Sequence, residues 1–292
     1  MPILEKDKKK ICYECVGDRQ HPALILIAGF GAQLINWDEE FINGLVSAGF
    51  CVITFDNRDT GLSSYYDQLD TPSVMDVIAK KQQGETVFPP YTLSDMAGDV
   101  VTLMDGLEIE KAHIAGISMG GQIAQVFAIE HPDRILSLTV IASGSGDPSL
   151  PPPTQAVLNF FFNPKEPGDL AAAIERHVEL HKIYYHPDDY DVELSRQRLT
   201  QSYQRAYHPK GNQRHLLAMI CAEPRTEALK NVRVPLLVIH GDYDPVFPAE
   251  HGRQLASLVD HAHLEMIENL GHGLPKRTYD TIAGLLKKVK GG

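Results

Sequence analysis

"HIAGISMGGQIAQ" (residues 113–125) places an apolar run directly before Gly-x-Ser-x-Gly and a helical pattern directly after it. The run predicts a buried strand, so Ser118 lies at the turn between this strand and a helix. The turn is so tight that side chains at positions 116 and 120 would collide across it, which explains a glycine at both. This arrangement predicts a nucleophilic serine whose Oγ projects from the carboxyl edge of a sheet. The alternative is an ordinary strand-to-helix turn in which the serine caps the helix.

The same alternation of strand and helix recurs along the chain. Nearly continuous apolar runs, typical of strands buried on both faces, are separated by segments with apolar residues at helical spacing. The predicted strands are 23–28, 51–56, 112–117, 136–143, 234–242 and 263–268, and the predicted helices are 37–49, 91–107, 120–132 and 276–289. We therefore expect an α/β fold, with a mostly parallel sheet flanked by helices.

A turn-rich stretch, "GSGDPSLPPP" (144–153), breaks this rhythm, and the pattern from about 154 to 230 is helical and irregular. The sequence thus predicts a core made of residues 1–145 and 231–292 and a helical cap, or lid, at 146–230. Aromatic residues of the cap are expected to shape an apolar pocket or to pack inside the cap itself: Phe160, Phe161, Phe162, Tyr184 and Tyr185.

A nucleophilic serine needs a base and an acid. His272 lies in the glycine-flanked loop "NLGHGLP" (269–275), after the last predicted strand, where parallel sheets place functional groups. Asp244 follows the preceding strand in "HGDYDPVFP" (240–248) and is expected to orient the imidazole. Its rivals are Asp242, which could be a turn-forming aspartate, and Asp147, which follows the strand after the serine turn.

An oxyanion hole needs two backbone donors. The N–H of Met119, the residue after the nucleophile, should supply one of them. The other should come from the loop after the first buried strand, where Phe30 is favoured over Gly31; the alternative is a glycine-rich turn with no donor role. This set of groups requires no metal and no cofactor.

Composition limits the classes of partner. The chain has 292 residues, 43% of them apolar, and 27 basic against 38 acidic residues give a net charge of −11 without a basic stripe. Nucleic acid is therefore not an expected partner, and no apolar run has the length that spans a bilayer, so we expect a cytoplasmic protein without a membrane partner. Cys12 and Cys15 have metal-site spacing but no second pair, and are interpreted as small core residues on one strand.

Taken together, these motifs resemble the α/β-hydrolase fold superfamily in its serine-nucleophile branch. The resemblance covers almost the whole chain and rests on "LIAGFGAQLINW" (26–37), "FDNRDTGLS" (55–63), "GISMGGQIAQVFA" (116–128) and the two loops that hold Asp244 and His272. Within the superfamily the chain looks most similar to the anthracycline (aclacinomycin) methylesterase-like hydrolases. It departs from the usual pattern at Ala28-Gly29, where the superfamily commonly has His-Gly, and at Arg58-Asp59-Thr60-Gly61, where Asp56 and Arg58 are interpreted as bracing a turn.

The resemblance implies a hydrolase that cleaves carboxylic esters, such as methyl esters of a small hydrophobic compound, through an acyl-enzyme on Ser118. Perhydrolases or haloperoxidases, carbon–carbon bond hydrolases and amidases share this triad and remain alternatives, and a ligand-binding receptor with a slow triad is the non-enzyme alternative. The expected partner is a small-molecule ester, and a homodimer is possible.

Overall fold

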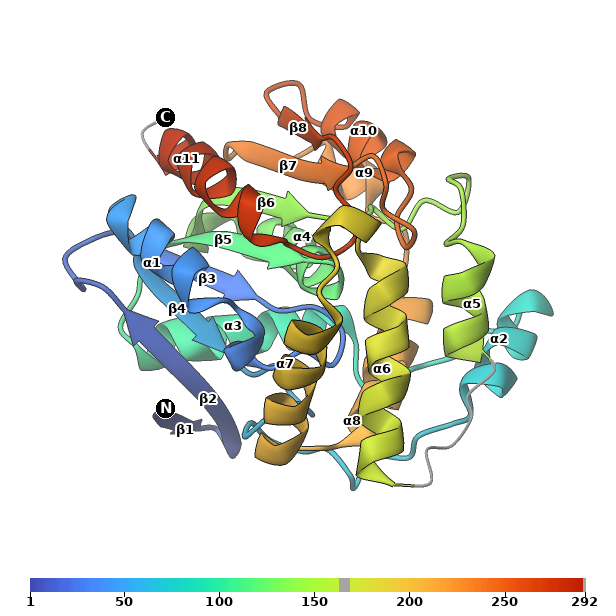
Figure 1. Cartoon of the computed structure of the whole chain (residues 1–292). Helices are drawn as coiled ribbons and strands as arrows, with labels where there is room; N and C mark the ends of the chain where they lie inside the picture. The colour runs from blue at the N-terminus through green and yellow to red at the C-terminus, as the bar shows by residue number, and fades with distance from the viewer. Residues whose placement is uncertain (163–168, 291–292) are drawn as a thin grey trace.

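The computed structural model describes residues 1–162 and 169–290, and within them eight strands form a single sheet (Figure 1). The strands are β1 (Ile3–Lys6), β2 (Lys9–Val16), β3 (Ala23–Ile27), β4 (Cys51–Phe55), β5 (Ala112–Ile117), β6 (Ile135–Ile141), β7 (Leu236–Gly241) and β8 (His263–Ile267). Their order in space is β1-β2-β4-β3-β5-β6-β7-β8. β1 and β2 pair antiparallel with each other, and β2 also pairs antiparallel with β4. All remaining pairs are parallel, which confirms the expected mostly parallel sheet.

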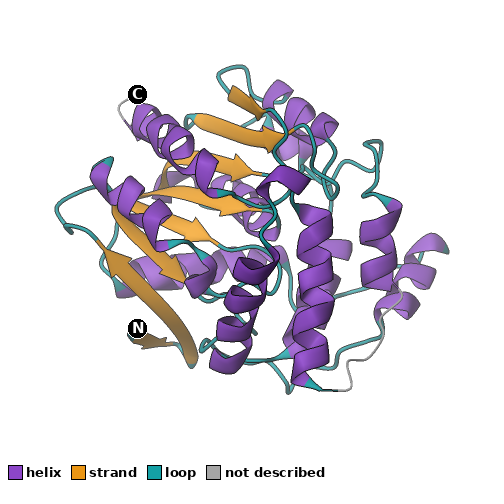
Figure 2. Cartoon of the chain, in the orientation of Figure 1, coloured by secondary structure: helices purple, strands orange, loops and turns teal. Residues whose placement is uncertain are grey.

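Helices cover both faces of this sheet (Figure 2). One face packs against α1 (Glu39–Ser47) and α11 (Tyr279–Lys290), and the other against α3 (Leu93–Gly106), α4 (Met119–Glu130) and α10 (Ala249–Ser257). Successive residues of β3 divide between the two layers: Leu24 and Leu26 join the α1/α11 core, whereas Ile25 and Ile27 join the α3/α4 core. Because both faces are covered, the strand is apolar without alternation.

The chain order reverses between β3 and β5. From β3 the chain crosses to β4 on one side, and β5 then pairs with β3 on the other side. Loops that leave two such strands diverge and open a crevice at their carboxyl ends, which is where open α/β sheets bind ligands. The loop with Phe30 and the turn with Ser118 both start at this crevice.

All described elements between β6 and β7 are helical: α5 (Gln155–Phe162), α6 (Leu170–Tyr184), η3 (Pro187–Asp189), α7 (Val192–Arg205), α8 (Pro209–Ile220) and α9 (Thr226–Leu229). In Figure 1, α5, α6 and α7 stand on the side to which the arrowheads of the parallel strands point. The remaining elements lie in connections elsewhere: η1 (Leu34–Asn36), α2 (Val74–Gln82), η2 (Pro132–Arg134) and η4 (Lys276–Thr278).

Buried ion pairs fasten α7 and α8 to the loop after β4. Arg205 at the end of α7 donates to Asp56 at 2.8 Å. Arg214 of α8 holds both oxygens of Asp59 at 2.7 Å, and both residues are only 1% exposed. A buried charge is costly unless a partner of opposite charge lies at good hydrogen-bonding geometry, so these pairs hold the two segments in one relative position. The segment "FDNRDTGLS" therefore braces structure, as expected for Asp56, and Arg58 does the same by pairing with Asp99.

The two cysteines with metal-site spacing lie on β2, where the alternation of side chains places them on opposite faces. Cys12 is buried in the core, as expected. Cys15 is half-buried, and its Sγ lies 3.1 Å from Sγ of Cys51 on the neighbouring β4.

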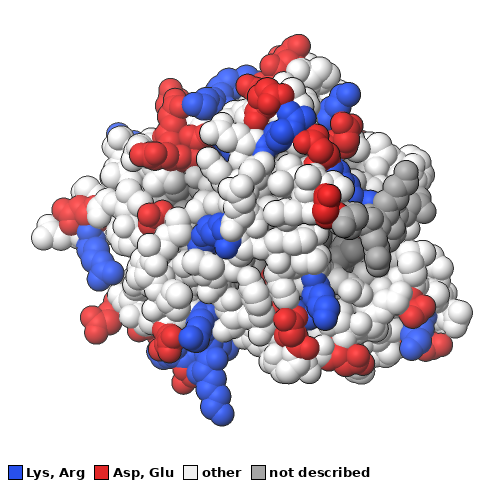
Figure 3. All heavy atoms as spheres, turned by 60° about the horizontal axis from the view of Figure 1, so that its bottom comes forward, with Lys and Arg blue, Asp and Glu red and all other residues white. Residues whose placement is uncertain are grey.

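Among the described residues, none of the helices has both the length and the apolar character needed to cross a bilayer. On the face drawn in Figure 3, acidic and basic side chains are interspersed among larger uncharged areas.

Candidate active site

Ser118 has the strained backbone that its turn requires. Its φ of 56° and ψ of −121° lie outside the regions that side chains favour. A Cβ at position 116 would lie 2.1 Å from the carbonyl oxygen of Gly120, and one at position 120 would lie 2.1 Å from that of Ile27. Only glycines allow this approach. Ser118 occupies the N-cap position of α4, but its side chain makes no capping hydrogen bond, so capping does not account for a serine here.

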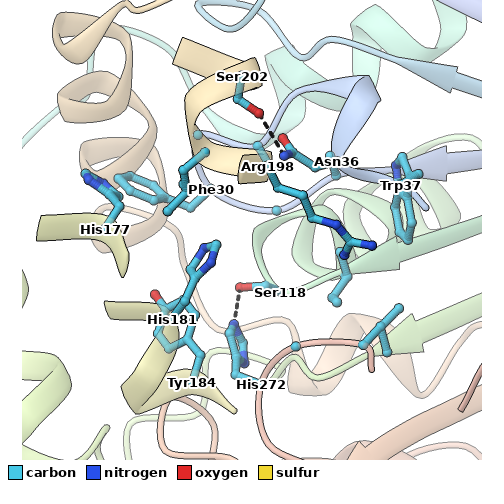
Figure 4. Close-up of a pocket in the computed structure, with 18 of the residues that line it drawn as sticks. Phe30, Asn36, Trp37, Ser118, His177, His181, Tyr184, Arg198, Ser202 and His272 are labelled. Atoms are coloured by element: carbon cyan, nitrogen blue, oxygen red, sulfur yellow. Dashed lines mark hydrogen bonds between the residues drawn. The ribbon is translucent and has the colours of Figure 1, made fainter. Parts of the chain in front are cut away.

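A chain of hydrogen bonds joins the three residues that the sequence singled out. Oγ of Ser118 lies 2.9 Å from Nε2 of His272, and Nδ1 of His272 lies 2.9 Å from Oδ2 of Asp244. A carboxylate only accepts, so Nδ1 carries the proton, and the Nε2 of the neutral ring accepts the hydroxyl proton of Ser118. Figure 4 shows Ser118 and His272 facing each other. This geometry suits transfer of the hydroxyl proton to the imidazole.

Asp244 is held as an ionised acceptor. The side chain is 5% exposed, and its second oxygen accepts from the N–H groups of Val246 and Phe247 at 2.8 and 2.9 Å. Burial alone would raise the pKa of Asp244, but the charge of His272 and the hydrogen bonds from His272 and Phe247 outweigh it and hold the pKa below its ordinary value. The carboxylate can therefore stabilise an imidazolium at position 272.

The rival aspartates have other partners. Asp242 accepts from the N–H of Asn269 at 2.7 Å, which braces the loop before His272. Asp147 bonds Ser149 and Gln254. Among the three candidates, only Asp244 contacts the imidazole.

The loop after β3 lies against the serine. A Cβ at Gly29 would be 3.4 Å from Cβ of Ser118 and 3.9 Å from its Oγ. The N–H of Gly31 is directed to Nδ1 of His215, at the long distance of 3.5 Å, whereas no acceptor within the described residues is recorded for the N–H of Phe30. Met119 is the first residue of α4, so its N–H has no acceptor inside the helix. Both N–H groups are thus available to a ligand beside Ser118.

Two side chains hold this loop in place. The chain has Ala28 at the position where the superfamily commonly has a histidine. Asn57 donates to the carbonyl of Ala28 at 3.1 Å. His215 of α8 is fully buried, and its Nε2 lies 2.7 Å from the carbonyl oxygen of Arg58, so Nε2 carries the proton and Nδ1 is left as an acceptor for Gly31. Burial lowers the pKa of His215 to about 4, which keeps the ring neutral. No local sequence pattern indicates His215, because its partners lie more than 150 positions away.

The end of α6 closes over His272. The N–H of His272 donates to the carbonyl of Tyr184 at 2.7 Å, and the two rings meet edge to face at 5.0 Å. A Cβ at Gly271 would lie 2.1 Å from the carbonyl oxygen of Tyr184, and one at Gly273 would lie 2.2 Å from the ring of Tyr185. The glycines that flank His272 therefore permit the close approach of the helical segment.

A cavity of about 250 Å³ opens above Ser118. Tyr184 and Tyr185 line it, as expected, whereas Phe160, Phe161 and Phe162 of α5 are not among its lining residues; Phe161 packs instead on the ring of Phe30 at 5.5 Å. Of the two expectations for these aromatic residues, lining the pocket holds for Tyr184 and Tyr185, whereas Phe160 packs within the helical segment against Phe161 and His177. The cavity also has polar lining residues that the sequence did not indicate, drawn in Figure 4: Asn36, Trp37, His177, His181, Arg198 and Ser202.

These polar groups come from α6, α7 and the segment after β3, which no local motif connects. His181 has its Nδ1 2.7 Å from Ser195, and burial lowers its pKa to about 4, so it is neutral. Arg198 pairs with Asp38, the capping residue of α1. The wall opposite Ser118 is consequently polar but has little net charge, because His181 is neutral and Arg198 is paired with Asp38.

The fold and this geometry define the class of the protein. Residues 22–275 match the α/β hydrolase fold family, and the chain belongs to that family and is a hydrolase.

The more particular likenesses are to methylesterases. The chain is 29% identical to rhodomycin D methylesterase DnrP of Streptomyces peucetius, over 97% of this chain and 96% of that protein, and 29% identical to the enzyme DauP of the same description from Streptomyces sp. strain C5. It is also 29% identical, over 85% of this chain and 80% of the relative, to a 2-hydroxy-6-oxononadienedioate/2-hydroxy-6-oxononatrienedioate hydrolase of Cupriavidus pinatubonensis. Among solved structures, the meta-cleavage product hydrolase CumD of Pseudomonas fluorescens IP01 has the same fold, with a TM-score of 0.77 at 23% identity, over 99% of this chain and 97% of that chain.

Proposed function

We propose that the protein hydrolyses a carboxylic ester of a small molecule by acyl transfer, with Ser118 as nucleophile, His272 as general base and acid, and Asp244 as the carboxylate that orients His272. The observation that carries this proposal is the hydrogen-bonded series Ser118–His272–Asp244 at the floor of a cavity. The likeness to two methylesterases over nearly the whole chain supports an ester, and a methyl ester in particular, as the substrate.

The reaction proceeds in two halves. His272 takes the hydroxyl proton as Oγ of Ser118 attacks the carbonyl carbon, and then gives that proton to the leaving alcohol. Water next attacks the acyl-enzyme, His272 takes its proton and returns it to Oγ, and the carboxylic acid leaves. Asp244 stabilises the imidazolium in both halves without being protonated.

The N–H groups of Phe30 and Met119 are proposed to hold the oxyanion. Their position beside Ser118 and the lack of a recorded acceptor for Phe30 support this role over one for Gly31, whose N–H is directed at His215. The positive end of the α4 dipole adds to the stabilisation of negative charge at the serine.

We propose that the chain consists of a core and a cap. The core, residues 1–145 and 231–292, carries the reacting groups, and the cap, residues 146–230, covers them. The contacts of Tyr184 with His272 and the lining residues on α6 and α7 support it. Part of this proposed cap, residues 163–168, lies outside the described residues.

The test is a panel of methyl and p-nitrophenyl esters, assayed with the unchanged protein and with Ser118→Ala. We expect multiple turnovers on at least one ester and a loss of kcat of about 10³-fold or more in the variant. Full activity of Ser118→Ala, or cleavage limited to one equivalent of ester per protein, would contradict the proposal.

The second candidate is cleavage of a carbon–carbon bond in an oxo-dienoate, favoured by the likeness to the Cupriavidus hydrolase. The same triad would serve it. Assaying a 2-hydroxy-6-oxo-dienoic acid beside a matched ester decides between the two, since we expect the larger kcat/KM on the ester.

A further inference from the structure

A second cavity contains an arginine that lacks an acidic partner among the described residues. Arg225, between α8 and α9, is 6% exposed. Its guanidinium donates to Oε1 of Gln125 at 3.1 Å and to the carbonyl oxygens of Gly144 and Glu223 at 3.0 and 3.4 Å. These acceptors are all uncharged. Of the buried arginines, Arg58 and Arg214 each have a carboxylate, whereas Arg225 forms no ion pair with any described residue.

Other groups in the same cavity complete a cationic cradle. The cavity has a volume of about 350 Å³ and shares no lining residue with the one above Ser118. Lys81 of α2 lines it, and its ammonium donates to the carbonyl of Ile220 at 2.8 Å without an acidic partner in the described chain. Gln122 of α4 also lines it but adds no charge; the residue is 8% exposed, and its Oε1, which only accepts, has no hydrogen-bond partner among the described residues, so it could bond only a protonated oxygen of a bound group.

The backbone leaves room beside the guanidinium. Gly146, with φ of +85°, lies at the cavity wall, and a Cβ there would be 3.5 Å from Nη2 of Arg225. Three donated hydrogen bonds also leave part of the guanidinium fork unused, since arginine has five N–H donors.

A buried cation without an anion is costly. Removing a guanidinium from water is repaid only when a counter-charge lies close to it. Burial lowers the pKa of Arg225 to about 10, because no neighbouring carboxylate opposes the desolvation. The one acidic residue that lines this cavity, Glu223, is exposed and gives Arg225 only its backbone carbonyl.

We propose that this cavity binds a small oxyanion, a carboxylate or a phosphate group, between Arg225 and Lys81. The guanidinium supplies paired donors that match two oxygens of such a group, and the ammonium supplies the second charge. Arg225 also ties the segment before α9 to the loop after β6, because its own N–H donates to the carbonyl of Ser145 at 2.8 Å. Bound anion therefore stabilises the junction between the helical segment and the sheet, independently of the function proposed for Ser118.

The test is calorimetric titration of the full chain with inorganic phosphate at constant ionic strength, with acetate as a competitor. We expect one site per chain, competition between the two anions, and a rise in melting temperature with phosphate concentration. Arg225→Gln should weaken the phosphate Kd by about tenfold or more, and Lys81→Gln by a smaller factor. Glu223→Gln should tighten the Kd, because it removes a like charge from the cavity rim.

Two controls keep the test decisive. Lys80→Gln removes an exposed charge next to Lys81 that does not line the cavity, and should leave the Kd unchanged. Ser118→Ala should also titrate as the unchanged protein does, even if the proposed hydrolysis is wrong. If Arg225→Gln does not fold, the opposite shifts of Lys81→Gln and Glu223→Gln carry the test. Absence of phosphate binding, or binding that none of the three cavity variants alters, would overturn the proposal.

Discussion

At the scale of the residue, Asp244 and Asp242 lie only two positions apart but have different partners. Asp244 contacts the imidazole, whereas Asp242 bonds the backbone of Asn269. We expect Asp244→Asn to lower kcat by about 10³- to 10⁴-fold, because an amide can donate to Nδ1 and so favours the wrong tautomer. The matched control Asp242→Asn should change kcat by less than about tenfold, since it keeps an oxygen for the backbone. Steady-state kinetics on one ester measure both, and equal losses would contradict the assignment.

The contacts of His215 with the loop that holds Phe30, the proposed oxyanion loop, lead to a second prediction at this scale. His215→Phe removes the acceptor for Gly31 and the donor for Arg58, so we expect kcat to fall by about tenfold or more with little change in KM. His215→Gln retains an acceptor and a donor and should recover much of the loss. Binding of a trifluoromethyl ketone, whose adduct places an oxyanion in the same site, should weaken in step with kcat. If His215→Phe instead raises KM alone, His215 does not position this loop.

At the scale of the element, the close contact between α6 and the His272 loop depends on glycine. A methyl group at position 273 would meet the ring of Tyr185 at 2.2 Å, so Gly273→Ala should displace either the loop or the helix end. We expect kcat/KM to fall by about tenfold or more, since small misplacements of catalytic groups are costly. Gly284→Ala in α11 is the control, because a Cβ there meets no atom within 4 Å. That variant should keep its activity and melt slightly higher. Unchanged kinetics of Gly273→Ala would show that the contact is dispensable.

At the scale of the element, local sequence pattern could predict some features of the protein and not others. Ser118, Asp244 and His272 each lie within five residues of the end of a largely apolar strand, so local pattern alone placed them at one edge of the sheet. Arg198, His215 and Arg225 have no such context, because each acts through partners in distant segments. The prediction that residues 276–289 form one helix was nearly right: a turn of 3₁₀ helix occupies Lys276–Thr278 and α11 begins at Tyr279. The sequence left open which aromatic residues of 146–230 line the pocket, because composition does not determine helix orientation.

At the scale of the whole molecule, buried histidines tie stability to pH. Burial lowers the pKa of His113, His181 and His215 each to about 4, against an ordinary value of 6.5. The unfolded chain therefore binds more protons than the folded chain between these values, so this stability is complete above pH 6.5 and is lost as the pH falls toward 4. Each such histidine contributes a slope of up to about 1.4 kcal/mol per pH unit.

Urea unfolding at pH 7, 5.5 and 4.5 measures this slope. His215→Gln should reduce the slope by up to the contribution of one bound proton, about 1.4 kcal/mol per pH unit. Carboxylates with lowered pKa, such as Asp59 and Asp244, lose their contribution only at lower pH, as the pH falls through their folded-state values. A stability that stays constant from pH 7 to 4.5 would show that these rings are not buried neutral in solution.

The central claim is that Ser118 is the one nucleophile that His272 and Asp244 activate. The most direct measurement is peptide mapping by mass spectrometry after reaction with a fluorophosphonate. We predict a single phosphonyl adduct on the peptide that contains Ser118, formed together with complete loss of ester hydrolysis. An adduct on another residue, or full hydrolysis after Ser118 has been modified, would contradict the claim.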